Sequence, residues 1–215
     1  MWGGFAPHSR LSIRRNELAI PACVRHGIRH VFFTMWGDDG GECPYFSALP
    51  ALMHAAAVAE GMSEAEMKEK FRAIVGEEYD AFLELDLPNH IFGEDKMVGS
   101  ANYSKNRLYD DCFLAILSLN AEGADGSVYR EYAERLHRRA EEGHAFRYLF
   151  DSMACLCDAL AIKFDLADKT RSLYAAGDKS GLRRLAENEY TALLSRLDAF
   201  YRAFRPCLLY TSPSP

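Results

Sequence analysis

Residues 36–42 (WGDDGGE) place one indole and three carboxylates within seven positions. They follow residues 28–34, whose β-branched and aromatic side chains predict a short buried strand. A tryptophan after such a strand offers a flat apolar face for the C–H side of a sugar ring, and carboxylates accept hydrogen bonds from the surrounding hydroxyls. Since α/β barrels build active sites at the carboxyl ends of their strands, the run indicates a carbohydrate site.

Two simpler interpretations of this run stay open on composition alone. Asp and Gly are common in ordinary turns, so the run also fits a solvated acidic turn. A calcium loop is the second alternative, although the carboxylates do not stand at the alternating positions of an EF-hand.

Other catalytic and metal-binding patterns are weak. His26 and His30 are four residues apart, but Gly27 interrupts a helix between them, so a metal-binding helix face is not expected. The sequence has no Gly-x-Ser-x-Gly nucleophile elbow, and Gly40-Gly41 lacks the Lys and Ser or Thr of a phosphate loop. The dispersed cysteines predict reduced structural thiols: Cys23, Cys43, Cys112, Cys155, Cys157 and Cys207. We therefore expect no metal and no cofactor.

Composition narrows the class of protein further. The 25 Lys and Arg against 31 Asp and Glu give a net charge of −6, which argues against a nucleic-acid partner. At 49% hydrophobic and 26% charged residues, the chain has ordinary globular composition. It has no apolar run long enough for a membrane span and no signal-peptide pattern at its start. These features predict a cytoplasmic protein without a membrane partner.

The first 61 residues predict half of an α/β repeat. A helix is expected from a Ser12 cap to Arg25, with a kink at Pro21, followed by the strand at 28–34. A second helix is expected over 46–59, with Pro50 in its first turn.

After Gly61 the pattern becomes helical. Ser63 and Glu66 form a predicted capping box that opens a helix ending near residue 75. Residues 86–106 predict a long loop, and long loops in compact domains are often functional. Apolar residues at helical spacing then predict a bundle, with helices at 108–119, 127–142, 146–164, 166–176 and 179–205. The run at 135–139 (RLHRR) predicts a solvated helix face.

Several of these segments resemble one enzyme family, the exo-β-N-acetylhexosaminidases of glycoside hydrolase family 20, in the bacterial branch with a helical domain after the barrel. The specific matches are VFFTMWGDDGGEC at 31–43 and FSALP at 46–50, with WGGFAPHSR at 2–10 similar to the end of the seventh strand. Weaker matches are YSKNRLYDD at 103–111, KFDL at 163–166 and YAAGDK at 174–179.

The resemblance implies an α/β plus all-α fold. Residues 1–61 would supply the last two strand–helix units of a TIM (β/α)8 barrel, and residues 62–206 a helical C-terminal domain. Residues 207–215 resemble translated adapter sequence and are expected to be a non-native tail, so we expect a C-terminal piece cut at both ends.

The resemblance also implies an activity: removal of terminal N-acetylglucosamine or N-acetylgalactosamine from glycans by substrate-assisted retaining hydrolysis. In this mechanism the 2-acetamido oxygen of the sugar attacks the anomeric carbon, an Asp orients that group, and an adjacent Glu protonates the leaving oxygen. By position, Trp36 would stack on the terminal sugar, Asp38 would bind its outer hydroxyls, Glu42 would orient the loop or reach the sugar, and Trp2 would line the pocket. No Asp-Glu dipeptide occurs in the sequence, so no catalytic residue is assigned and the chain alone is expected to be inactive.

A second hypothesis comes from the helices. The region after Gly61 also fits a non-catalytic interaction module, and a homodimer through the helical domain is the expected assembly. A further alternative places residues 86–106, with Tyr103 and Asn106, over the sugar pocket.

Overall fold

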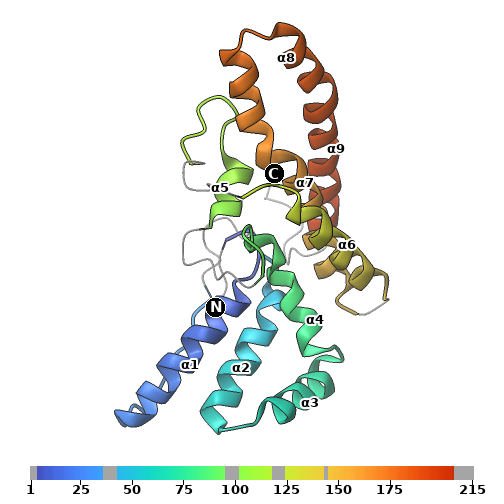
Figure 1. Ribbon diagram of the computed structural model, residues 1–215. Coiled ribbons are helices and arrows are strands. Elements are labelled where there is room, and N and C mark those ends of the chain that lie inside the picture. Colours follow the sequence, from blue (N-terminus) through green and yellow to red (C-terminus); the bar gives the residue numbers. More distant parts are fainter. Residues whose placement is uncertain (1–3, 36–42, 95–101, 118–123, 143–144, 206–215) are drawn as a thin grey trace, which may run out of the picture.

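The computed structural model describes residues 4–35, 43–94, 102–117, 124–142 and 145–205, and within them the regular elements are helices. Figure 1 shows α1 to α4 gathered at one end of the molecule and α7 to α9 at the other. In chain order the elements are α1 (Ser9–Arg25), η1 (Tyr45–Ala48), α2 (Leu49–Glu60), α3 (Glu64–Val75), α4 (Tyr79–Leu83), η2 (Glu84–Asn89), α5 (Tyr103–Tyr109), α6 (Val128–Glu141), α7 (Arg147–Ala175), α8 (Lys179–Leu185), η3 (Ala186–Tyr190) and α9 (Thr191–Phe204).

Helix α3 begins and ends where the sequence predicts, whereas α2 begins at Leu49, after η1, and the sequence predicts its start at residue 46. Pro50 lies in the first turn of α2, and Gly61 follows the helix with a φ of 68°. The Ser63 hydroxyl accepts a hydrogen bond from the Glu66 amide at 3.3 Å, and the Glu66 carboxylate accepts one from the Ser63 amide at 2.8 Å. Both halves of the predicted capping box are therefore confirmed.

Helix α1 begins three residues earlier than predicted. Its first residue is Ser9, and Ser12 lies inside the helix, where its amide donates to the His8 carbonyl at 2.9 Å. The Ser12 cap is therefore wrong. The helix instead begins where Asp86 accepts a hydrogen bond from the Arg10 amide, a contact between residues 76 positions apart.

The predicted strand at 28–34 is also wrong for the part of the chain that the structure describes. These residues have no regular structure, and Phe32 is 90% exposed. A strand is completed by hydrogen bonds to a neighbouring strand, and the described residues provide no such neighbour. The helical half of the predicted fold is seen, and the two barrel units are not.

Further differences concern the helical region. Residues 110–117 form turns instead of a helix over 108–119, because the Asp111 carboxylate accepts hydrogen bonds from the amides of Phe113 and Leu114, both at 2.8 Å. The expected break near residue 165 is absent, so α7 is one helix of 29 residues. The predicted loop at 86–106 contains η2 at its start and α5 at its end, and residues 95–101 lie outside the described residues.

One main core joins the two ends of the described chain. Phe82 contacts Phe71, Phe146 and Phe150 edge-on, with ring centroids 5.3 to 5.7 Å apart. Phe5 and Ala57 belong to the same buried cluster. Residues before Gly61 therefore pack directly on the helical region, and the proposed division at residues 61 and 62 remains a prediction. None of the described helices combines the length and apolar character needed to cross a membrane.

Candidate functional site

The residues predicted to contact sugar lie outside the described residues. Trp2 falls within 1–3, while Trp36, Asp38 and Glu42 fall within 36–42. Their roles therefore stay predictions. The structure does describe the residues that follow 1–3 and those on both sides of 36–42, and these flanks are informative.

The two ends of the 36–42 segment meet in one small cluster. Met35 packs against Cys43 and Ala48, which are both buried. The Ser47 hydroxyl donates to the Pro44 carbonyl and lies 3.1 Å from the sulfur of Cys43. A loop whose ends are held together by its own packed base has few ways to move as a whole. The described residues on the two sides of 36–42 therefore lie together beside the start of α2.

The segment that follows Trp2 is fixed by a different set of contacts. Gly4 adopts a φ of 74°, a conformation that favours glycine, and Phe5 and Ala6 are buried directly after it. The Asn89 amide donates to the Pro7 carbonyl at 2.9 Å, and the Asn102 amide lies 3.2 Å from Nε2 of His8. Residues of the helical region therefore hold residues 4–8 in place.

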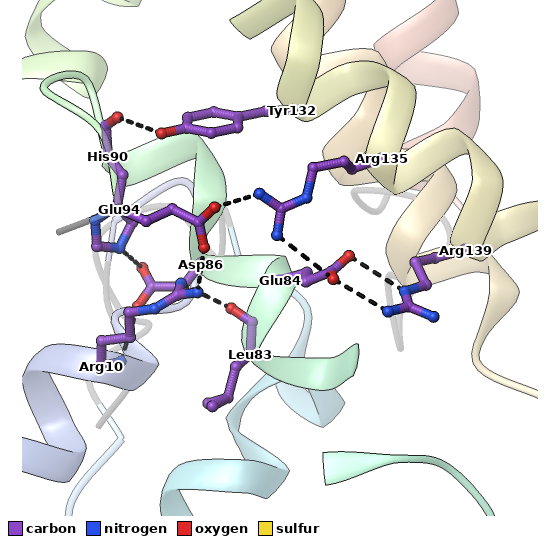
Figure 2. A network of polar contacts seen from close by, with 9 residues as sticks. All are labelled: Arg10, Leu83, Glu84, Asp86, His90, Glu94, Tyr132, Arg135 and Arg139. Carbon is purple, nitrogen blue, oxygen red and sulfur yellow. Dashed lines mark hydrogen bonds and ion pairs between the residues drawn. The ribbon is translucent and has the colours of Figure 1, made fainter. Parts of the chain in front are cut away.

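Asp86 is the centre of this polar network, and it is 1% exposed. Its carboxylate accepts hydrogen bonds from the Arg10 amide at 2.8 Å and from the Asn89 side chain at 2.7 Å, and it lies 3.5 Å from Nε2 of His90 (Figure 2). Burial acts to raise the pKa of Asp86, but the hydrogen bonds and charge of His90, Asn89 and the Arg10 amide outweigh it and lower the pKa. An ionised carboxylate at this place also favours the N-terminus of α1.

A chain of alternating charges extends from this centre across the molecule, as Figure 2 shows. The Arg10 guanidinium donates to the Leu83 carbonyl at 3.0 Å and to Glu94 at 2.9 Å. Arg135 of α6 pairs with Glu94 and lies 3.5 Å from Glu84.

The chain ends at Arg139, which donates to Glu84 at 3.1 and 3.2 Å. The run at 135–139 is thus only partly the solvated face that the sequence predicts, since Arg135 and Arg139 join α6 to η2. The network links the start of α1, η2 and α6.

The pairing of Asp86 with His90 has the residue types of an acid–base dyad, but its burial points to another use. His90 is 4% exposed, and its own carbonyl accepts a hydrogen bond from the Tyr132 hydroxyl at 3.1 Å. Neither Asp86 nor His90 lines a cavity that the structure describes, so no route for a substrate leads to them. Positioning of the segment after Trp2 is therefore the role that the geometry supports.

Sequence reasoning did not find this network. Its strongest contacts join residues 76 to 94 positions apart, and no local motif marks them. The one local signal is the polar composition of residues 86–106, and it predicts only a loop. His26 and His30, the rejected metal pair, are exposed.

The described residues contain no cluster of three His, Cys, Asp or Glu side chains arranged to hold a metal ion. The cysteines at 23, 43, 112, 155 and 157 are free thiols, while Cys207 lies outside the described residues.

Comparison with known families gives one match. The family described as Glycoside Hydrolase 20C C-terminal domain matches residues 80–208, from α4 through α9. No curated protein matches the chain. The matched region contains Asp86, Asn89 and Asn102, the side chains that hold residues 4–10.

Proposed function

This chain belongs to the glycoside hydrolase 20C family through its C-terminal domain, and on that premise we propose that it is part of an exo-β-N-acetylhexosaminidase. The reaction is the removal of terminal N-acetylglucosamine or N-acetylgalactosamine from glycans with retention of configuration. The observation that carries the proposal is a set of contacts between the family's helical domain and the segment that follows Trp2. The Asn89 side chain donates to the Pro7 carbonyl, and the Asn102 side chain contacts His8.

In this proposal the chain binds the sugar and does not supply the proton donor. Trp36 stacks on the C–H face of the terminal sugar, and Asp38 accepts hydrogen bonds from its outer hydroxyls. Glu42 orients the loop or reaches the sugar, and Trp2 lines the pocket. The packed base formed by Met35, Cys43 and Ala48 supports this arrangement, because it fixes where the loop starts and returns.

The apolar run at 28–34 supports the proposal that this segment packs in the barrel that the resemblance implies. Ile28, Val31, Phe32 and Phe33 all expose large apolar side chains. In the whole enzyme we expect these residues to pair with neighbouring strands. The chain by itself is then inactive, because its described residues form no such strands and its sequence has no Asp-Glu pair.

Two assays test this function. The purified 215-residue chain should release no nitrophenol from nitrophenyl N-acetyl-β-glucosaminide. Release by the chain alone contradicts the proposal that this chain does not supply the proton donor. In the whole enzyme, Trp36→Ala should lower kcat/KM by about 10- to 100-fold, the loss expected for one aromatic contact with the sugar. Trp36→Phe keeps a ring face and should lose less, and equal activity in all three proteins contradicts the stacking role.

A second function, assembly of a homodimer, is favoured by one surface. Phe113, Leu114, Ile116 and Leu117 of the 110–117 turns are exposed, and the exposed Tyr174 of α7 contacts Phe113 at 6.3 Å between ring centroids. Exposed apolar groups gathered on an ordered turn are typical of protein interfaces. We propose that this apolar turn is the dimer contact.

Sedimentation velocity tests the dimer. Leu114→Glu should shift the chain to monomer while the helical circular dichroism signal is retained. Leu194→Glu, a matched change at an equally exposed leucine of α9, should leave the dimer intact. A dimer that survives Leu114→Glu, or a wild-type chain that is monomeric, contradicts this assembly.

A further inference from the structure

A cavity of about 330 Å³ lies between α1, α2, α3 and α4, and neither Asp86 nor His90 lines it. Apolar side chains form most of its wall, contributed by Ile13, Ala57, Met62, Met67 and Leu83. This volume is within the range of small-molecule sites. Apart from Val58, the remaining lining groups are polar, and two of them carry a buried atom with no hydrogen-bond partner among the described residues.

The first unpartnered group is the hydroxyl of Tyr79, which lines the cavity from the start of α4. Tyr79 is 4% exposed, and its ring is fixed edge-on against Phe71 with centroids 5.3 Å apart. Among the described residues the hydroxyl has no hydrogen-bond partner. Burial raises the pKa of Tyr79, so the hydroxyl stays protonated and can donate or accept.

The second unpartnered group is Nδ1 of His54, on α2. The other ring nitrogen, Nε2, lies 3.6 Å from the Glu17 carboxylate. Burial lowers the pKa of His54 more than Glu17 raises it, so the ring is neutral at pH 7. A neutral ring keeps its proton on the nitrogen that faces the carboxylate, which leaves Nδ1 as a buried acceptor.

The charges around the cavity are mainly negative. Glu17, Glu64 and Asp80 line it, and Lys68 lies 2.8 Å from both Glu64 and Asp80. One positive charge against three negative charges leaves a formal charge of −2. A ligand that satisfies the buried acceptors therefore gains from being a cation with several N–H donors.

We propose that this cavity binds a small primary amine in its protonated form, with an apolar body. The ammonium group donates to Nδ1 of His54 and to the Tyr79 hydroxyl and faces Glu17, while the body packs against Met62 and Met67. The proposal is independent of the glycosidase function, because it uses none of the predicted sugar contacts.

Isothermal titration of the full chain with three matched probes tests the chemistry: cyclohexylamine, cyclohexanol and cyclohexanecarboxylate. Cyclohexylamine should bind about tenfold more tightly than cyclohexanol, the factor that one charge-assisted hydrogen bond contributes, and the carboxylate should not bind. Equal binding of amine and alcohol, or no binding of the amine, overturns the proposal.

Substitutions then separate binding from folding. Tyr79→Phe removes only the unpartnered hydroxyl, so the amine affinity should fall while the melting temperature does not. Glu17→Gln, at an exposed position, should also weaken the amine and leave the alcohol unchanged. Tyr201→Phe on the exposed face of α9 is the matched control and should change neither quantity. If Tyr79→Phe and Glu17→Gln both leave the amine affinity unchanged, the amine binds elsewhere and the site is wrong.

Discussion

Replacing Asp86 by alanine removes the centre of the network that joins the N-terminal segment to the helical region. Two donors lose their acceptor, the Arg10 amide at 2.8 Å and the Asn89 side chain at 2.7 Å, and Nε2 of His90 loses a carboxylate that lies 3.5 Å away. Breaking a buried charged network by removing one partner costs about 3–5 kcal/mol. This loss is a large share of the roughly 5–15 kcal/mol by which a domain is stable. We expect Asp86→Ala to lower the free energy of unfolding by this amount.

Urea unfolding followed by circular dichroism at 222 nm measures the change. The matched control is Asp198→Ala, which removes an exposed carboxylate paired with Arg202 at 2.7 Å. Because exposed ion pairs contribute little, the control should change the free energy of unfolding by about 0.5 kcal/mol or less. A loss below about 1 kcal/mol for Asp86→Ala would show that the two donors find other acceptors. The network around Asp86 would then contribute little to stability.

The pH dependence gives a second measure of the same group. The pKa of Asp86 is lowered in the folded protein, so its stabilisation is present above the unfolded pKa, about 3.9, and is lost as the pH falls through the folded pKa. Between about pH 5 and pH 2, the wild-type chain should therefore lose stability more steeply than Asp86→Ala. Parallel loss in both proteins contradicts the assigned shift.

Other predictions address separate contacts. Ser63→Ala removes the capping box of α3 and should cost about 1 kcal/mol by urea unfolding, whereas Ser63→Asp should retain most of it. Lys163→Met removes two hydrogen bonds from the buried ammonium group to carbonyls at the end of α5 and should cost about 2–3 kcal/mol; a stable variant refutes this role. Burial raises the pKa of Cys155 to about 11, so its alkylation by iodoacetamide should be slow at pH 8, and fast labelling there contradicts it. The hydrogen bond that the His137 ring donates to Asp158 raises the pKa of His137, so its stabilisation is complete below the unfolded value near 6.5 and is lost as the pH rises through the folded pKa. His137→Gln should remove that loss.

The sequence predicted best the features that are decided locally. The capping box at Ser63 and Glu66, the proline at the start of α2 and the left-handed glycines at 61 and 76 all depend on residues within one helical turn. The apolar spacing at 146–164 likewise predicted a helix and its buried face, although the expected break near residue 165 is absent.

The errors share one cause, which is competition from contacts that a local pattern does not contain. Residues 28–34 have the composition of a strand, but a strand also requires a neighbour. Helix α1 begins at Ser9 because Asp86 reaches its first turn from 76 residues away. Asp111 binds two amides that a helix over 108–119 would need.

The candidate site could be predicted only in part for the same reason. The indole and carboxylates of residues 36–42 are adjacent in sequence, so their chemistry is readable as a motif. The side chains that fix the segment after Trp2 come from residues 86–102, and only the fold brings them together.

The exposed run from Ile28 to Phe33 has a consequence for handling the chain in solution. A β-prone segment outside regular structure, with uncovered apolar side chains, favours intermolecular β-pairing, and only Arg29 and His30 interrupt it with polar groups. Two copies that align along this run would satisfy each other's amides and begin a growing aggregate. We therefore expect aggregation to increase steeply with protein concentration. Replacing Phe32 by a charged residue should suppress it without altering the helices.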